Sequence, residues 1–377
     1  MVICLEHWQN NAEINIGIPD KMKIMTVGYL HGSGGAERQI ILLSNQLVGL
    51  GHDVTLCVLN ENKSPYTIDE KVRMIDLCNE EGTGRLRIWR RYKAFRRAVK
   101  KVRPDVIVNY NLQSAYFCLG ISKKARGKVV YSERGDPYDK EYSGLLGKIR
   151  DLTVAHMDGL VFQSEGARDF FPNKVKEKSV VIHNSVNVPQ EKYPMPAVRE
   201  KRIINVGRLH PQKNQKLLID AFAKIAPDFP EYNVDIYGDG QLRDELQQQI
   251  DSLNLHGRIR LNASRKDIFD CIYKASLFVL TSDYEGMPNA LMEAMALGLP
   301  CISTDCRPGG ARTLIEQGVN GYIVHCGDKD ALAQVMKQLL NASEVSERMS
   351  CEARKLGISH SNESIFNKWD SFIKTLC

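Results

Sequence analysis

The chain has 377 residues, 43% of them hydrophobic and 25% charged, so it is long enough for two globular domains with separate cores. Its net charge of +6 is too small for this length to indicate a nucleic-acid partner. No apolar run reaches the roughly 18 residues of a membrane span and no secretory signal is recognisable, so we expect a cytoplasmic protein.

The ten cysteines show no C-x-x-C pair and no metal-ligand spacing. Several of them sit inside apolar, strand-like runs. We therefore expect reduced, buried thiols rather than disulfides or a zinc site.

The first half of the chain is expected to form one domain. Residues 1–21 include no clear strand or helix period and are interpreted as an N-terminal extension. From residue 22 to 186, apolar runs alternate with amphipathic segments, which is typical of a parallel sheet with crossover helices. The expected strands are residues 24–29, 53–59, 105–110, 128–132, 159–163 and 179–182.

A glycine-rich loop from His31 to Glu37 follows the first expected strand and leads into a helix. Free N–H groups at such a helix N-terminus favour an anionic ligand, so Gly34 and Gly35 are candidate ligand-binding residues. A dinucleotide fingerprint requires a glycine where this chain has Glu37, and a carboxylate there would repel a pyrophosphate. The alternative is a tight turn that binds nothing.

A strongly basic segment begins at Arg85 and ends at Arg103. It contains ten Lys or Arg and no acidic residue, while its apolar residues recur at helical spacing. This pattern predicts a basic amphipathic helix, which could bind anionic lipid headgroups or a polyprenyl diphosphate acceptor. The alternative is a solvated basic face on a helix that only packs against the sheet.

A proline-containing stretch at residues 187–200 is interpreted as an interdomain linker. A second domain is expected at residues 201–360, followed by a helix at 361–377 that returns to the first domain. The sequence thus predicts an α/β protein of two tandem Rossmann-like, doubly wound parallel-sheet domains facing a cleft. The second set of expected strands is 203–206, 233–237, 258–261, 277–281, 301–304 and 321–324.

Two cations follow the first strand of the second domain and precede a helix. Arg208 and Lys213 come just after Gly207 and lie five positions apart. An Arg side chain can donate two hydrogen bonds to phosphate oxygens, a Lys adds a point charge, and the helix dipole favours an anion there. The alternative is a pair of solvated surface charges.

The segment 281–300 carries the most specific signal. Its helix is apolar over residues 290–297 except at Glu293, and a buried carboxylate needs donors, which ligand hydroxyl groups can supply. A buried arginine is the alternative partner. Glu285 lies in the preceding loop and can face the cleft. The backbone at the start of this helix is a candidate diphosphate site, formed by Gly286, Met287, Asn289 and Ala290.

Together these motifs resemble the GT4 family of retaining glycosyltransferases, which have the GT-B fold. The family hallmark is a glutamate, seven residues and a second glutamate, here Glu285 and Glu293. The glycine loop, the cation pair, residues 237–240 and residues 318–324 occur in the family's order. Residues 132–137 and 283–290 are most similar to bacterial members that build capsule, O-antigen or other lipid-linked polysaccharides.

By this resemblance, the protein moves a hexose or N-acetylhexosamine from a nucleotide-diphosphate sugar, expected to be a UDP-sugar, to a glycan acceptor on polyprenyl diphosphate. Arg208 and Lys213 are expected to hold the donor diphosphate, Glu285 the donor sugar and Glu293 the ribose. The departing phosphate assists acceptor deprotonation, so no protein nucleophile, cofactor or metal is expected. The basic helix would hold the protein at the cytoplasmic face of the inner membrane.

The acceptor side departs from the family pattern. The family often has a histidine at the end of a first-domain strand, where this chain has Ser132, Glu133 and Arg134, which are its candidate acceptor-side residues. Asp328 and Asp330 have the D-x-D form of a metal motif, but they begin a helix, so Asp328 is interpreted as an N-cap.

Two other functional hypotheses stay open. One is an NDP-sugar epimerase or a hydrolase on the same scaffold, although a hydrolase would need two carboxylates flanking the scissile bond with access to water. The other is a non-catalytic protein that binds nucleotide sugars.

Overall fold

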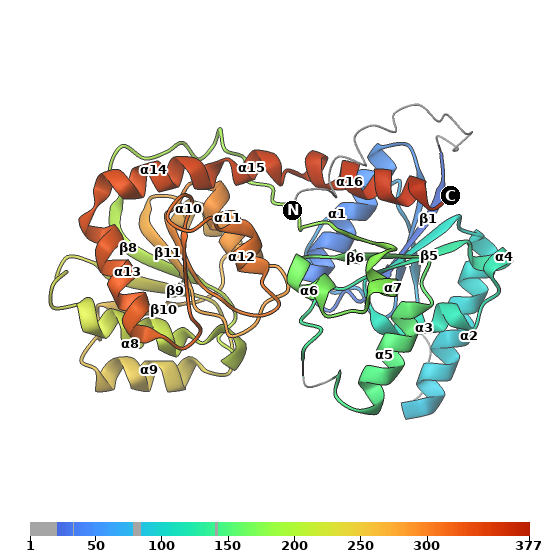
Figure 1. Ribbon diagram of the computed structural model, residues 1–377, viewed down its shortest axis with the longest axis horizontal. Coiled ribbons are helices and arrows are strands. Elements are labelled where there is room, and N and C mark those ends of the chain that lie inside the picture. Colours follow the sequence, from blue (N-terminus) through green and yellow to red (C-terminus); the bar gives the residue numbers. More distant parts are fainter. Residues whose placement is uncertain (1–20, 33, 78–83, 140–141) are drawn as a thin grey trace.

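The computed structural model describes residues 21–32, 34–77, 84–139 and 142–377 (Figure 1). Residues 1–20 of the expected N-terminal extension lie outside these ranges. Two α/β domains lie side by side, and the last helix lies over the first domain (Figure 1). No helix in the described ranges combines the length and the apolarity needed to cross a membrane.

The first domain is built on a seven-stranded, all-parallel sheet of order β3-β2-β1-β4-β5-β6-β7. The central strands are buried on both faces, which is why they read as near-continuous apolar runs. The strands are β1 (Lys23–Gly28), β2 (Asp53–Val58), β3 (Arg73–Asp76), β4 (Val106–Asn109), β5 (Lys128–Ser132), β6 (Gly159–Phe162) and β7 (Ser179–Val181).

Helices cover both faces of this sheet. Apolar residues of α1 and α16 pack on one face, and those of α2, α3 and α5 pack on the other. The helices of the first domain are α1 (Gly35–Gly49), α2 (Gly84–Val102), α3 (Leu112–Leu119), α4 (Lys123–Arg126), α5 (Leu145–Ala155), α6 (Glu165–Asp169) and α7 (Asn173–Lys176).

The second domain repeats the plan with a six-stranded parallel sheet of order β10-β9-β8-β11-β12-β13. Its strands are β8 (Glu200–Val206), β9 (Asn233–Tyr237), β10 (Ile259–Asn262), β11 (Ala275–Leu280), β12 (Cys301–Thr304) and β13 (Tyr322–Val324). Its helices are α8 (Gln215–Ile225), α9 (Arg243–Ser252), α10 (Ile268–Ile272), α11 (Asn289–Ala296), α12 (Gly310–Leu314), α13 (Lys329–Asn341), α14 (Ser343–Arg354) and α15 (Leu356–Ser359).

The strand orders confirm the predicted doubly wound fold. In each sheet the chain moves outward first to one side and then to the other, so the order reverses between β1 and β4 and between β8 and β11. Ligands of such sheets bind outside the carboxyl ends of the strands at this reversal. The loops after β1 and β4 and after β8 and β11 flank these reversals, and the loop after β5 lies beside the one after β4, so these are the places to look for a site.

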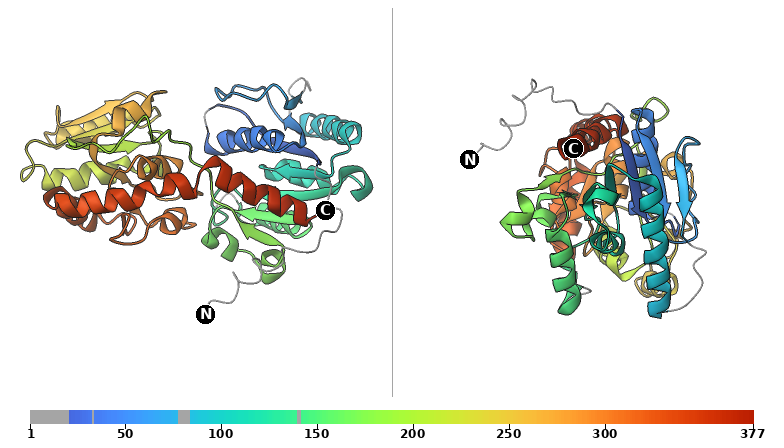
Figure 2. Two further views of the ribbon diagram at one scale, coloured as in Figure 1. Left: turned by 90° about the horizontal axis from the view of Figure 1, so that it is seen from above. Right: turned by 90° about the vertical axis from the view of Figure 1, so that its right-hand side faces the viewer.

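The last helix, α16 (Asn362–Thr375), is part of the first domain in space although it ends the chain (Figures 1 and 2). Its apolar face is fully buried in the core that also contains Ile24 and Val106, and it packs along α1. The residues that fill this contact are Ile365, Phe366, Trp369 and Ile373.

Candidate active site

The centre of the candidate site is an ion pair between Lys213 and Glu285, two residues in different loops of the second domain. Glu285 Oε1 also accepts a hydrogen bond of 2.7 Å from Ser282 Oγ. The stem of Lys213 packs over Gly207, where a Cβ would lie 3.4 Å from Lys213 Cδ. The pair is mostly shielded, since the two side chains are 18% and 9% exposed.

The two loops that carry this pair are tied together by several hydrogen bonds. The Gln212 carbonyl accepts from the Asp283 N–H at 2.8 Å, and Gln212 Nε2 donates to the Tyr284 carbonyl at 2.8 Å. Thr281 Oγ1 donates to the Lys213 carbonyl at 2.9 Å. Lys213 and Glu285 are therefore held by a rigid pair of loops at the carboxyl ends of β8 and β11.

The glycines of the segment 237–240 have a steric role beside these loops. A Cβ on Gly238 would lie 1.9 Å from the Gly207 carbonyl oxygen, and one on Gly240 would lie 2.2 Å from the Leu209 carbonyl oxygen. Only glycine allows the backbone after β9 to lie against the loop that bears Arg208. Arg208 itself is loosely held, with Nη2 at 3.5 Å from Gln212 Oε1.

Glu293 projects from α11 toward the first domain, where it forms an ion pair with Arg38 of α1. This is the arginine partner that the sequence left open, and it comes from the opposite domain. The neighbouring residues of α11 are fully buried, whereas the Glu293 side chain is 14% exposed. Its carboxylate therefore lies where the two domains meet.

Three further candidate residues lie at the same interdomain contact. A Cβ on Gly35 would lie 2.5 Å from Asn289 Nδ2, and one on Gly286 would lie 2.5 Å from the Arg134 carbonyl oxygen. Asn289 Oδ1 accepts a hydrogen bond of 2.7 Å from Asn184 Nδ2. The start of α11 therefore faces the glycine loop of the first domain, with Met287 buried beside it.

Glu37 has a structural role in the glycine loop. Its carboxylate accepts hydrogen bonds from the N–H groups of His31 at 3.0 Å and Gly32 at 2.7 Å. These two amides are satisfied within the loop, so they are not free to bind a phosphate in this arrangement. Gly35 of this loop lies against Asn289 of the second domain, whereas a Cβ on Gly34 would meet only Glu37 of the same loop.

The three candidate acceptor-side residues differ in how far their side chains are occupied by hydrogen bonds within the first domain. Ser132 is buried and its Oγ lies 3.4 Å from the Val161 carbonyl oxygen. The Glu133 carboxylate accepts from the N–H groups of Arg134 and Gly135 and from the Tyr131 hydroxyl, each at 3.0 Å. Both side chains are thus engaged within the first domain.

Arg134 is the exception among them. Its Nη1 donates to Asn184 Oδ1 at 2.9 Å, and its guanidinium lies 4.0 Å from the centre of the Tyr110 ring. Nε and Nη2 are buried without a hydrogen-bond partner among the described residues. Burial lowers the pKa of Arg134. The backbone carbonyl of Arg134 lies beside Gly286, whereas its guanidinium lies against Tyr110 and Asn184 of the first domain.

Sequence reasoning missed Arg38, Asn184 and the stacking of Arg134 on Tyr110. For Arg38 the only available signal was its place in the first turn of the helix that follows the glycine loop. Asn184 lies just beyond β7, at the carboxyl end of a strand, which is a general indication of a site but not of a partner.

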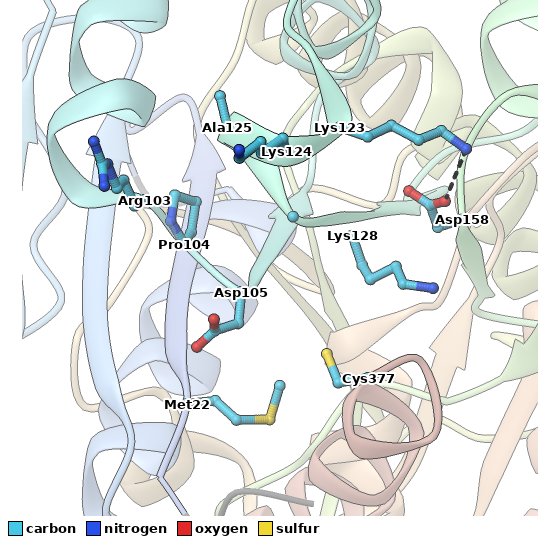
Figure 3. A pocket seen from close by; sticks show the side chains of 11 residues that line it. Met22, Arg103, Pro104, Asp105, Lys123, Lys124, Ala125, Lys128, Asp158 and Cys377 are labelled. Atoms are coloured by element: carbon cyan, nitrogen blue, oxygen red, sulfur yellow. Dashed lines mark ion pairs between the residues drawn. The ribbon is translucent and has the colours of Figure 1, made fainter.

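A pocket of about 510 Å³ lies at the other end of the first sheet, where its strands begin (Figure 3). The two aspartates that line it accept hydrogen bonds from backbone amides: Asp105 from the Lys23 N–H at 2.7 Å and Asp158 from the Val129 N–H at 2.9 Å. It lies at the amino ends of the strands, so we do not assign the site there.

The D-x-D segment forms a helix start, as expected. Asp328 Oδ1 accepts from the Ala331 N–H at 2.9 Å, which confirms the predicted N-cap of α13, and Asp330 pairs with Lys224. Among the described residues no group of three or more His, Cys, Asp or Glu could hold a metal ion.

Two facing Rossmann-like domains, with paired cations and carboxylates at the strand ends where they meet, define a GT-B type of protein. Residues 33–190 match the family described as Glycosyltransferase Family 4, and residues 190–356 match the family Glycosyl transferases group 1. The chain therefore belongs to the GT4-type glycosyltransferases, which confirms the resemblance found in the sequence.

Curated relatives match over nearly the whole chain. An uncharacterized glycosyltransferase of Haemophilus influenzae is 24% identical over 93% of this chain and 98% of its own length. A Campylobacter jejuni α-1,4-N-acetyl-D-galactosaminyltransferase, whose name gives a glycan on PP-undecaprenol, is 25% identical over 91% of this chain and 96% of its own. The amylovoran biosynthesis glycosyltransferase AmsD of Erwinia amylovora is 24% identical over 94% and 99%.

Solved structures show the same fold. Anabaena HepE in complex with UDP and glucose superposes with a TM-score of 0.78 at 20% identity, covering 94% of this chain and all of that one. The outer core galactosyltransferase WaaB superposes with a TM-score of 0.70 at 18% identity, with 94% and 100% covered.

Proposed function

We propose that this protein is a retaining glycosyltransferase of bacterial surface polysaccharide biosynthesis. It transfers a hexose or N-acetylhexosamine from a UDP-sugar to a glycan acceptor on polyprenyl diphosphate at the cytoplasmic face of the membrane. The observation that carries the proposal is the pairing of Lys213 with Glu285 beside Arg208, at the strand ends that face the first domain. The acceptors and donors named for the relatives support the substrate classes.

The chemistry follows from where charge develops. When the bond between sugar and phosphate breaks, negative charge grows on the leaving diphosphate. Lys213, Arg208 and the N–H groups at the start of α11 are positive groups that stabilise this charge. In this proposal the donor diphosphate takes the place of Glu285 at Lys213, which frees Glu285 to accept hydrogen bonds from the sugar hydroxyls.

In this proposal Glu293 binds the ribose hydroxyls of the donor. A carboxylate on a buried helix can accept hydrogen bonds from two vicinal hydroxyls, and these would replace its ion pair with Arg38. The departing diphosphate receives the acceptor proton, so the proposal needs no protein nucleophile, cofactor or metal.

The test is a transfer assay. Purified protein is mixed with a panel of UDP-, GDP- and ADP-sugars and a glycan on polyprenyl diphosphate, and nucleotide release and product are measured. We expect UDP release that depends on acceptor, an α-configured product by NMR from an α-linked donor, and no loss with EDTA. Sugar release or isomerisation from the donor alone would favour a hydrolase or an epimerase, and donor binding without transfer to any acceptor would favour a binding protein.

A further inference from the structure

Exposed apolar side chains gather on one layer of helices in the first domain. The part of the chain that the structure describes exposes sixteen large hydrophobic side chains, and nine of them lie on α2, α3 and α5. Helix α3 packs against both of the others, so the three form one layer on the sheet. We call this layer the outer helical face; its exposed apolar residues are Leu86, Ile88, Trp89, Tyr116, Leu119, Leu145, Leu146, Ile149 and Leu152.

Helix α5 has a reversed distribution of residues. Leu145, Leu146, Ile149 and Leu152 recur at helical spacing along one side and are 72%, 59%, 38% and 61% exposed. The opposite side is buried against the domain although it is formed by smaller or polar residues, namely Gly147, Arg150, Thr153 and Val154. A helix that presents its leucines to water while burying a glycine and a threonine indicates a surface that is covered in use.

Helix α2 adds cations to this apolar surface. Its first turns expose Leu86, Ile88 and Trp89 at about half of each side chain. The Lys93 ammonium lies 3.5 Å from the centre of the Trp89 ring. Further along the helix every exposed position from Arg96 onward is Lys or Arg.

The described helices α2 and α5 contain few acidic residues. Helix α2 contains no acidic residue, and the one acid of α5, Asp151, lies 2.8 Å from Arg150 Nη2. The amino ends of α2 and α5 project in the same direction from the domain, as seen in Figure 1 and in the right-hand view of Figure 2. The surface is therefore apolar at its projecting end and positive along α2.

We propose that the outer helical face docks on the surface of an anionic lipid bilayer. The leucines of α5 and the first turn of α2 enter the boundary between headgroups and acyl chains, and the cations of α2 contact lipid phosphates. Bulky apolar residues next to a helix rich in Lys and Arg fit this partner because a bilayer supplies both an apolar layer and a negative surface. The inference deepens the proposed function, since it names the surface at which a lipid-linked acceptor is reached.

The experiment is vesicle flotation of the full chain, without nucleotide, on phosphatidylcholine alone and on phosphatidylcholine mixed with phosphatidylglycerol. The apolar variant combines Leu145→Ser, Leu146→Ser and Leu152→Ser. The cationic variant combines Arg96→Gln, Lys100→Gln and Lys101→Gln. The matched control combines Val198→Ser and Ile358→Ser, which are 83% and 72% exposed but lie outside the outer helical face.

We expect the wild type and the control to float with the anionic vesicles. The apolar variant should lose about tenfold or more of its binding to these vesicles. The cationic variant should lose roughly 10- to 100-fold of the preference for anionic over neutral vesicles, and added salt should act on the wild type in the same way.

Three results would overturn the proposal. The wild type could float with neither kind of vesicle, or the apolar variant could float like the wild type. The wild type could also form a dimer that the leucine substitutions dissociate, which would mean that a second copy of the chain covers this face. Sedimentation velocity measures the last. Stabilisation by UDP, followed by thermal shift in every variant, reports the donor site separately. If UDP stabilises no form of the protein while flotation behaves as expected, the proposed function fails and the docking surface stands.

Discussion

Replacing Lys213 by methionine removes one positive charge and keeps the aliphatic stem that packs over Gly207. In the wild type the ammonium pairs with Glu285, and both side chains are largely shielded from water. The structure gives the Glu285 carboxylate two side-chain hydrogen bonds, and after the change it keeps only the one from Ser282 Oγ at 2.7 Å. The variant therefore loses a cation at the leaving group and leaves a carboxylate poorly paired.

The two losses have different magnitudes. A fixed positive group beside developing charge contributes about 3 to 4 kcal/mol to a transition state, so kcat should fall roughly 10²- to 10³-fold. Removing one partner of a shielded ion pair costs about 3 kcal/mol of stability, less whatever water recovers by reaching Glu285. A second variant, Lys213→Met with Glu285→Gln, removes the stranded charge and should regain stability without regaining activity.

The assay measures UDP release and product formation at saturating donor, with stability followed by urea unfolding. Lys216→Met is the matched control, because Lys216 pairs with Glu245 on the open surface and such a pair contributes about 0.2–1 kcal/mol. The control should keep its kcat. A folded Lys213→Met enzyme with kcat within about twofold of the wild type would refute the role of Lys213.

Three other changes have expected outcomes. Glu293→Gln removes a charge-assisted contact of about 1.5 to 3 kcal/mol, so the Kd for UDP should rise roughly 10- to 150-fold by calorimetry; an unchanged Kd contradicts the ribose assignment. Gly286→Ala places a Cβ 2.5 Å from a first-domain carbonyl oxygen and should lower both Tm and kcat, whereas Gly49→Ala in helix α1 meets nothing within 4 Å and should raise Tm slightly without changing kcat. Burial lowers the pKa values of His183 and His360 to about 4, below the ordinary 6.5, so their neutral forms stabilise the fold above pH 6.5 and this contribution is lost as pH falls from 6.5 toward 4. In the double variant His183→Gln, His360→Gln, the free energy of unfolding measured in urea should fall less between pH 6.5 and 4 than in the wild type. The same pH profile in both proteins would count against this role of the two histidines.

Most strands were predictable because their residues are largely buried and read as apolar runs. The exception is β3, Arg73–Asp76, which the sequence analysis did not anticipate. It is a short edge strand with mostly exposed side chains, so neither an apolar run nor a clean alternation marks it. The strand is defined by pairing with β2, a tertiary contact that periodicity does not encode.

The candidate site was predictable to the extent that its residues lie close together in the sequence. Gly207, Arg208 and Lys213 share one loop, and Glu285 shares a short segment with Glu293, so strand ends and helix starts place them in one region. The structural role of Glu37 could not be predicted, because the hydrogen bonds of its carboxylate to the backbone of the glycine loop depend on local geometry that the pattern does not specify.

Contacts across the domains could not be predicted in the same way. Arg38 and Glu293 are 255 positions apart, and Asn184 and Asn289 are 105 apart. Arg38 and Asn289 lie in first helical turns, Asn184 follows a strand and Glu293 lies within α11, and none of these positions identifies the partner. Which ones meet depends on how two independently folded domains dock, and that is set by the shape of the whole contact rather than by local preference.

The two glutamates differ in a way that bears on how a donor enters. Glu285 is neutralised by a lysine of its own domain, whereas Glu293 is neutralised by Arg38 of the other domain. A nucleotide sugar brings hydroxyls for the carboxylates and phosphates for the cations, so it can replace both ion pairs with its own contacts. Exchange at Glu285 leaves the domains where they are, but exchange at Glu293 removes a contact that joins them. We therefore expect donor binding to change the arrangement of the domains, and identical solution scattering with and without saturating UDP would exclude this coupling.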